Sequence, residues 1–144
     1  METIKEILKK KGTEIWSVTP ASKVFDALQL MAEKNIGAVL VIENERLVGI
    51  LSERDYARKV ILQGQSSKEI EVREIMSSKV LFVTPQLSVE DCMALMIDKR
   101  LRHLPVFEND KLIGIISIGD VVKSVLDEKK YQIAQLEQYI TGIR

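Results

Sequence analysis

Apolar and polar positions follow the same order twice along this chain. Each half opens with a short apolar run that ends in Thr-Pro, at Val18-Thr19-Pro20 and again at Val83-Thr84-Pro85. The proline stops strand pairing and presets a turn into a helix. Apolar residues then recur at helical spacing, with Ser22 and Ser88 as expected N-caps. These helical positions are Val24, Leu28, Met31 and Ala32 in the first half and Val89, Met93 and Met96 in the second.

Two further apolar runs follow in each half and indicate a β-hairpin. Polar residues of high turn propensity separate these runs, Glu43-Asn44-Glu45 in the first half and Glu108-Asn109-Asp110 in the second. A second helix is expected after each hairpin, so each half is predicted to be β-α-β-β-α. The predicted strands are Ala38–Ile42, Leu47–Leu51, Leu104–Phe107 and Leu112–Ile116, and the second helices are Glu53–Leu62 and Ile118–Leu126.

A tandem duplication explains this recurrence. Shifting the chain by 65 residues aligns 18–55 with 83–120 without a gap, and 16 of the 38 paired residues are identical. A repeat fixes architecture before any single motif does. We therefore expect an α+β (α/β) fold in which two β-α-β-β-α repeats pack face to face as a pseudo-twofold pair, with two related clefts where they meet. Function is expected at those clefts.

Shorter segments surround the repeats. The amphipathic N-terminus and the apolar positions Ile133, Leu136, Ile140 and Ile143 of the tail predict short terminal helices. The tail helix is as consistent with packing on its own domain as with exchange across a homodimer. The expected divisions are 1–14 (N-terminal helix), 15–62 (repeat 1), 63–78 (linker and a short helix over Val72–Met76), 79–127 (repeat 2) and 128–144 (C-terminal helix).

Composition narrows the classes of function. The 144 residues contain 46% hydrophobic residues, with 21 basic and 21 acidic side chains, so a general field attracting nucleic acid or an anionic membrane is not expected. No apolar stretch is long enough to span a membrane, and a cytoplasmic protein is predicted. The single cysteine, Cys92, aligns with Ala27 and is expected to be a small buried residue.

A shared motif closes each hairpin. Gly-apolar-apolar-Ser-x-x-Asp ends at Ser52 and Asp55 in the first half and at Ser117 and Asp120 in the second. One interpretation is a helix capping box. The other is a nucleotide site, because a strand that runs into a helix N-terminus presents amides to a phosphate while a nearby carboxylate can accept both ribose hydroxyls. Its presence in both halves favours the nucleotide interpretation.

Together, the duplicated units, the Thr-Pro turns, Leu104-Pro105-Val106 and the two Ser-x-x-Asp motifs resemble a cystathionine β-synthase (CBS) domain pair. The resemblance extends from about residue 15 to residue 126 and implies clefts that bind adenosyl ligands, commonly in a dimer. It implies that Asp55 and Asp120 hold ribose hydroxyls and that Ser52 and Ser117 line the sugar or phosphate. It further implies that Thr19, Thr84, Gly37 and Ala38 approach the base or sugar.

The two halves differ where the resemblance places a basic pair for phosphates. Arg102-His103 stands in the second half, whereas Gly37-Ala38 stands in the first, so the two clefts are expected to be unequal. Arg54 on the first-half helix is a candidate for an additional positive charge. Its counterpart, Gly119, permits close backbone approach by a ligand.

The sequence leaves three classes of function. The leading one is a regulatory sensor that binds an adenine nucleotide such as AMP, ADP, ATP or NAD(H), or S-adenosylmethionine, and signals to an unknown partner by changing shape, without a metal requirement. An interaction scaffold with vestigial sites is the alternative. An enzyme is disfavoured, because the chain has one His, one Cys and no Walker or dinucleotide-binding glycine motif.

Overall fold

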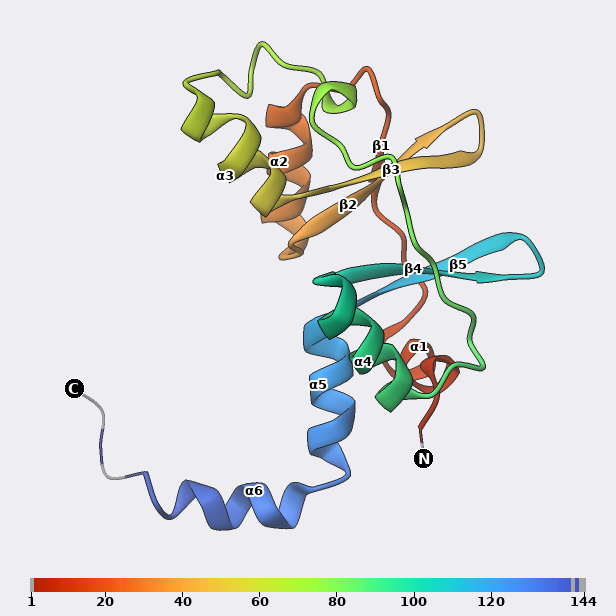
Figure 1. The fold of residues 1–144 in the computed structure, drawn as a ribbon, viewed down its shortest axis with the longest axis vertical. Coiled ribbons are helices and arrows are strands. Elements are labelled where there is room, and N and C mark those ends of the chain that lie inside the picture. Colours follow the sequence, from red (N-terminus) through yellow and green to blue (C-terminus); the bar gives the residue numbers. More distant parts are fainter. Residues whose placement is uncertain (1, 141, 143–144) are drawn as a thin grey trace. The chain divides into compact units, whose positions relative to one another are not determined.

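The computed structural model describes residues 2–140 and 142, and of residues 131–133 only the backbone. The chain divides into two compact units, each treated by itself below (Figure 1). The first-repeat unit comprises residues 14–81. The second-repeat unit comprises residues 2–13 together with the chain from Phe82 onward. The N-terminal segment therefore belongs with the repeat that lies farther from it in the sequence.

The first-repeat unit has the predicted β-α-β-β-α order. Strand β1 pairs in parallel with β2, and β2 pairs antiparallel with β3, which leads directly into α3. Two single-turn 3₁₀ helices follow α3. The elements are β1 (Ser17–Val18), α2 (Val24–Lys34), β2 (Ala38–Glu43), β3 (Arg46–Ser52), α3 (Glu53–Lys59), η1 (Ile61–Gln63) and η2 (Val72–Glu74).

The second-repeat unit repeats this order with one shortened strand. Its elements are α1 (Ile4–Lys11), α4 (Val89–Lys99), β4 (His103–Glu108), β5 (Lys111–Ser117), α5 (Ile118–Asp127) and α6 (Lys130–Glu137). The expected strand before α4 is reduced to a single bridge between Val83 and Val106. Proline explains the loss: Leu40 N–H donates to Trp16 O in the first unit, whereas Pro105 occupies the matching position and has no N–H.

Both predicted hairpins are confirmed, and their turns show why the sequence specifies them. Asn44 and Glu45 have φ values of 50° and 64°, and Asn109 and Asp110 have 52° and 63°. Two successive left-handed residues match the right-handed twist of the flanking strands, and asparagine tolerates this conformation well. The register then places Ser52 opposite Ala38 and Ser117 opposite His103 at the far end of each hairpin.

Each repeat is completed by a segment that lies outside it in the sequence. Ile4 N–H donates to Leu87 O at 3.0 Å, and Val72 N–H donates to Ser22 O at 2.8 Å, two acceptors that are 65 residues apart. Helix α1 thus occupies on the second repeat the place that η2 occupies on the first. Ile4, Ile7 and Leu8 of α1 are at most 5% exposed and belong to the core of the second-repeat unit.

One of the two expected N-caps is confirmed. The Ser88 hydroxyl accepts from Asp91 N–H at the start of α4. The expectation for Ser22 is wrong, because α2 starts one residue later and its N-cap is Lys23, which makes no side-chain cap bond. The Ser22 hydroxyl instead accepts from Thr19 N–H and closes the turn after β1.

The tail and the cysteine lie in contrasting environments. Leu136 on α6 and Ile140, three residues past its end, are about two-thirds exposed, at 65% and 67%, whereas Ile143 and the side chain of Ile133 lie outside the described residues. Cys92 is fully buried as expected, and burial raises the pKa of its thiol to about 11. In the described part of the chain, no helix is long and apolar enough to cross a membrane.

Candidate functional site

The motif at the end of β5 forms a complete capping box at the start of α5. The Ser117 hydroxyl accepts from Asp120 N–H at 3.1 Å, and Asp120 Oδ2 accepts from Ser117 N–H at 2.8 Å. These reciprocal bonds fix the carboxylate at the junction between strand and helix. The structural interpretation of the motif is therefore confirmed, and it orients the same carboxylate that a ribose would need.

The junction between β3 and α3 has the same geometry. Asp55 Oδ2 accepts from Ser52 N–H at 2.9 Å and from the Ser52 hydroxyl at 3.1 Å, and Asp55 N–H donates back to the Ser52 hydroxyl. Both carboxylates are mostly covered, with 16% of the Asp55 side chain and 24% of the Asp120 side chain exposed. Two equivalent, preorganised carboxylates thus lie in two units.

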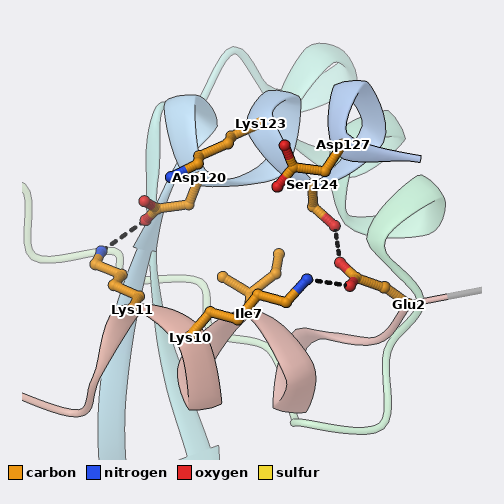
Figure 2. Close-up of a pocket in the computed structure, with 8 residues that line it drawn as sticks. All are labelled: Glu2, Ile7, Lys10, Lys11, Asp120, Lys123, Ser124 and Asp127. Atoms are coloured by element: carbon orange, nitrogen blue, oxygen red, sulfur yellow. Dashed lines mark hydrogen bonds and ion pairs between the residues drawn. The ribbon is translucent and has the colours of Figure 1, made fainter. Parts of the chain in front are cut away.

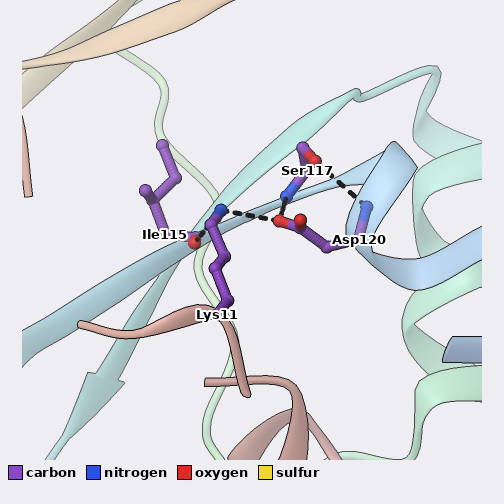
Figure 3. A network of polar contacts seen from close by, with 4 residues as sticks. All are labelled: Lys11, Ile115, Ser117 and Asp120. Carbon is purple, nitrogen blue, oxygen red and sulfur yellow. Dashed lines mark hydrogen bonds and ion pairs between the residues drawn. The ribbon is translucent and has the colours of Figure 1, made fainter. Parts of the chain in front are cut away.

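Each carboxylate also contacts a lysine, but the two lysines lie in different segments of the chain. Lys11, the last residue of α1, lies with Nζ 2.6 Å from Asp120 Oδ2 and donates to Ile115 O at 2.9 Å (Figure 3). Lys59, one turn along α3, lies 3.2 Å from Asp55 Oδ1 and donates to Ile75 O. Although burial acts to raise the pKa of Asp120, the bonds from Lys11 and Ser117 hold it below its ordinary value.

Sequence reasoning missed both lysines. Lys59 follows Asp55 by four residues on a helix, so the i,i+4 pair could have been found from spacing. Lys11 and Asp120 are 109 residues apart, and no local pattern connects them. The contact arises only because α1 packs on the second repeat.

The helix starts offer fewer unbonded amides than the motif suggested. Ile118 N–H donates to Arg102 O at 2.8 Å, and Glu53 N–H donates to Gly37 O at 3.0 Å. With the third amide of each helix bonded to the capping serine, two of the first three amides are already used inside each unit. Positively charged side chains are therefore the better candidates for holding a phosphate here than the helix amides.

The second-repeat junction has one such side chain, that of Arg102, next to a histidine. Arg102 is exposed at the start of β4, and His103 lies directly across the ladder from Ser117. Burial lowers the pKa of His103, and the nearby charges of Lys11 and Arg102 lower it further, so the imidazole is neutral at pH 7. At the matching positions of the first-repeat unit, Gly37 and Ala38 provide no charge.

Of the remaining predicted residues, Arg54 and Gly119 lie in the first helical turn of their junctions, but Thr19 and Thr84 lie away from them. The register places Val18 beside Val41 and Val83 beside Val106, so both threonines lie toward the hairpin turns, whereas the junctions are at Ala38 and His103. Thr19 and Thr84 are exposed at the turns after their strands, and the Thr19 hydroxyl contacts that of Ser22 at 3.0 Å. Arg54 is exposed in the first turn of α3. Gly119 is exposed in α5, where an added Cβ would contact only the Ser117 hydroxyl, at 3.6 Å, so packing within the unit does not require glycine there.

Comparison with known proteins identifies the fold. The family model of the CBS domain matches residues 4–61 and 72–127. The chain belongs to the CBS domain family. It is 41% identical over 150 residues to the mitochondrial CBS domain-containing protein CBSX3 of Arabidopsis thaliana, covering 97% of this chain and 72% of that protein.

Solved CBS structures agree with this assignment. A signal-transduction protein with CBS domains from Burkholderia ambifaria is 54% identical and superposes with a TM-score of 0.84, over 87% of this chain and 94% of that one. The CBS domain pair of protein MJ0100, solved with 5′-methylthioadenosine and S-adenosyl-L-methionine, is 19% identical with a TM-score of 0.78, over 89% and 98%. That second likeness concerns the fold alone.

A polar pocket adjoins the Asp120 junction of this CBS protein. It has a volume of about 200 Å³ and lies between α1 and α5 (Figure 2). Lys11 and Asp120 close one end, and Glu2, which bonds both Lys10 and the Ser124 hydroxyl, closes the other. Polar contacts thus connect residues 2–11 to α5 at both ends of the pocket.

Proposed function

We propose that this CBS protein is a regulatory module that binds adenosine-containing nucleotides and signals occupancy by a conformational change. The observation that carries the proposal is the preorganised carboxylate of Asp120, fixed by a capping box beside the basic pair Arg102-His103. A carboxylate held in this way can accept sugar hydroxyls without first losing side-chain freedom. The single His and the buried Cys of the chain offer no nucleophile–base pair, which favours binding over catalysis.

The two carboxylates have the same proposed role, and their surroundings differ. In the proposed complex, Asp55 and Asp120 accept ribose hydroxyls, and Ser52 and Ser117 line the sugar. Arg102 then holds phosphate by its charge and His103 by a hydrogen bond from its neutral ring, whereas Gly37 and Ala38 offer the first repeat neither. Because a cation at a partly desolvated site favours an anion, the second-repeat site prefers ligands with more phosphate charge.

Several ligands meet this description. AMP, ADP, ATP, NAD(H) and S-adenosylmethionine all share the adenosine that the carboxylates would bind. The MJ0100 pair holds two adenosyl ligands, so this fold can accommodate the class. Native mass spectrometry of the purified protein, reporting the ligand mass and the oligomer together, selects among them.

Arg102 is expected to distinguish phosphorylated from unphosphorylated ligands. Replacing Arg102 by alanine should weaken AMP about tenfold, because a charge-assisted bond to phosphate is lost, and should leave adenosine within about twofold. Calorimetric titration of both ligands measures the difference, with the exposed Arg73→Ala in the first-repeat unit as the control. Equal losses for AMP and adenosine would contradict a phosphate role.

We also propose that the protein is a homodimer to which the tail helix contributes. The support is the exposure of Leu136 on α6 and of Tyr139 and Ile140 just after it, which are 65%, 79% and 67% open to solvent. Deleting the residues after Asp127 should lower the dimer fraction while leaving both units folded. Light scattering over a concentration series measures this, and an unchanged mass in the truncated protein would contradict it.

An interaction scaffold with vestigial sites is the second candidate function. The exposed apolar side chains Ile97, Val122 and Leu126 on α4 and α5 favour it, because surface apolar groups are common at protein contacts. Absence of any thermal shift with the whole set of adenosyl ligands would support this alternative. The predicted cytoplasmic location stays a prediction, and the Arabidopsis relative carries a mitochondrial designation.

A further inference from the structure

Lys11 occupies the carboxylate that the proposed ligand needs. Asp120 Oδ2 already accepts two hydrogen bonds, from Lys11 Nζ at 2.6 Å and from Ser117 N–H at 2.8 Å. A ribose that uses both carboxylate oxygens must therefore compete with one of these donors. The Ser117 bond belongs to the helix cap, so Lys11 is the donor that can leave.

Three features of Lys11 make its displacement from Asp120 by a ligand feasible. It is the last residue of α1, its side chain is 34% exposed, and it reaches Asp120 through a flexible four-carbon chain. Once displaced from Asp120, the ammonium has among the described residues only a neutral protein acceptor, Ile115 O at 2.9 Å, so its charge requires an anionic partner or water. His103 pairs across the ladder with Ser117, which is itself bonded to Asp120, so the same junction already carries the basic pair proposed for phosphate.

We propose that Lys11 is a specificity-determining residue that makes the second-repeat site prefer phosphorylated over unphosphorylated adenosine ligands. This inference rests on the proposed function of Asp120. An unphosphorylated ligand displaces Lys11 from Asp120 and offers no anion in return. A nucleotide phosphate gives the released ammonium a new partner beside Arg102.

In the first-repeat unit, the lysine that contacts the carboxylate does not come from a separate segment. There Lys59 binds Asp55 from the same helix, on Oδ1, one turn away. The residue that matches Lys59 in the second repeat is Ser124, whose hydroxyl bonds Glu2. The second repeat thus takes its lysine from α1, and ligand occupancy at Asp120 changes how the end of α1 is held.

The test is a calorimetric comparison of adenosine and AMP in Lys11→Met. Binding is measured in an Asp55→Asn background, so that the second-repeat site dominates. Adenosine should bind about two- to fivefold tighter, because a competing ion pair is gone, whereas AMP should bind about tenfold weaker. Lys9→Met, which removes the same charge from the same turn of α1, should change neither affinity, and Lys11→Arg should keep most of the preference for AMP.

A second readout does not depend on any ligand. Because Lys11 holds the pKa of Asp120 below its ordinary value, Lys11→Met should raise that pKa toward the ordinary value. Carbon-13 NMR of the Asp120 carboxyl over the acidic pH range measures the shift, and Lys9→Met should leave it unchanged. An unaltered Asp120 pKa in Lys11→Met would remove the contact on which the inference depends.

The outcomes separate the two proposals. If AMP and adenosine bind and Lys11→Met changes both by the same factor, or neither, the role of Lys11 is overturned and the proposed function stands. If Lys11→Met reverses or abolishes the preference for AMP, both stand. If neither ligand binds the unsubstituted protein, the proposed function fails and the specificity role fails with it.

Discussion

Replacing Asp120 by alanine is expected to weaken adenosine-containing ligands more than any other single substitution, by on the order of 30- to 1,000-fold in dissociation constant. The variant removes the carboxylate that would accept the ribose hydroxyls and leaves those hydroxyls without a charged acceptor. Isothermal calorimetry with AMP measures the change, in the Asp55→Asn background so that the first-repeat site does not mask it.

The same substitution also removes one half of the α5 capping box, and a matched variant separates the two effects. Glu74 of η2 is exposed and closes a capping box of the same kind, because its carboxylate accepts from Glu71 N–H at 2.7 Å. Glu74→Ala should cost about 1 kcal/mol of unfolding free energy or less and leave AMP binding unchanged. Unsubstituted affinity in Asp120→Ala would remove the ribose assignment.

Replacing Ile4 by alanine is expected to destabilise the second-repeat unit by about 2–5 kcal/mol. Ile4 is fully buried in the core that contains Val89, Leu104 and Ile116, although it lies outside the repeat in sequence. Losing most of its side chain leaves a cavity that a packed core fills only in part. Hydrogen exchange should accordingly show lost amide protection in β4 and β5 while β2 and β3 keep theirs.

The control for Ile4→Ala is an isoleucine in the same unit that faces solvent. Ile97 on α4 is 65% exposed, so Ile97→Ala should change stability by about 0.5 kcal/mol or less. If Ile4→Ala reduced protection in residues 15–62 instead, the assignment of α1 to the second repeat would be wrong. Comparable stability in the two variants would also contradict it.

The sequence was sufficient for the elements whose signals are local. Asn44 and Asn109 mark turns that need left-handed backbone, and Ser52 and Ser117 mark helix starts, so the strand–strand–helix order follows from neighbouring residues. Because the chain is duplicated, each of these turn and helix-start signals occurs twice. The register at the far end of each hairpin does not follow from the turn alone. In the second repeat a β-bulge between Val106 and Phe107 shifts the pairing by one residue and so places His103 opposite Ser117.

Other features depend on contacts between distant parts of the chain. Nothing in the amphipathic pattern of residues 4–11 indicates that Ile4 N–H bonds Leu87 O or that Lys11 reaches Asp120. The loss of the strand before α4 depends on Pro105, which lies on β4 and has no N–H to donate to the residues before α4. The sequence therefore predicted the two carboxylates of the site but not the two lysines that contact them.

We propose that the preorganised carboxylates of this CBS protein bind the ribose of an adenine nucleotide. Parallel calorimetric titration of the unsubstituted protein with AMP and with 2′-deoxy-AMP tests this, because the two ligands differ by one hydroxyl. AMP should bind, and 2′-deoxy-AMP should bind at least about tenfold more weakly, since one charge-assisted hydrogen bond is lost. Equal affinity for the two ligands, or no binding of either, would contradict it.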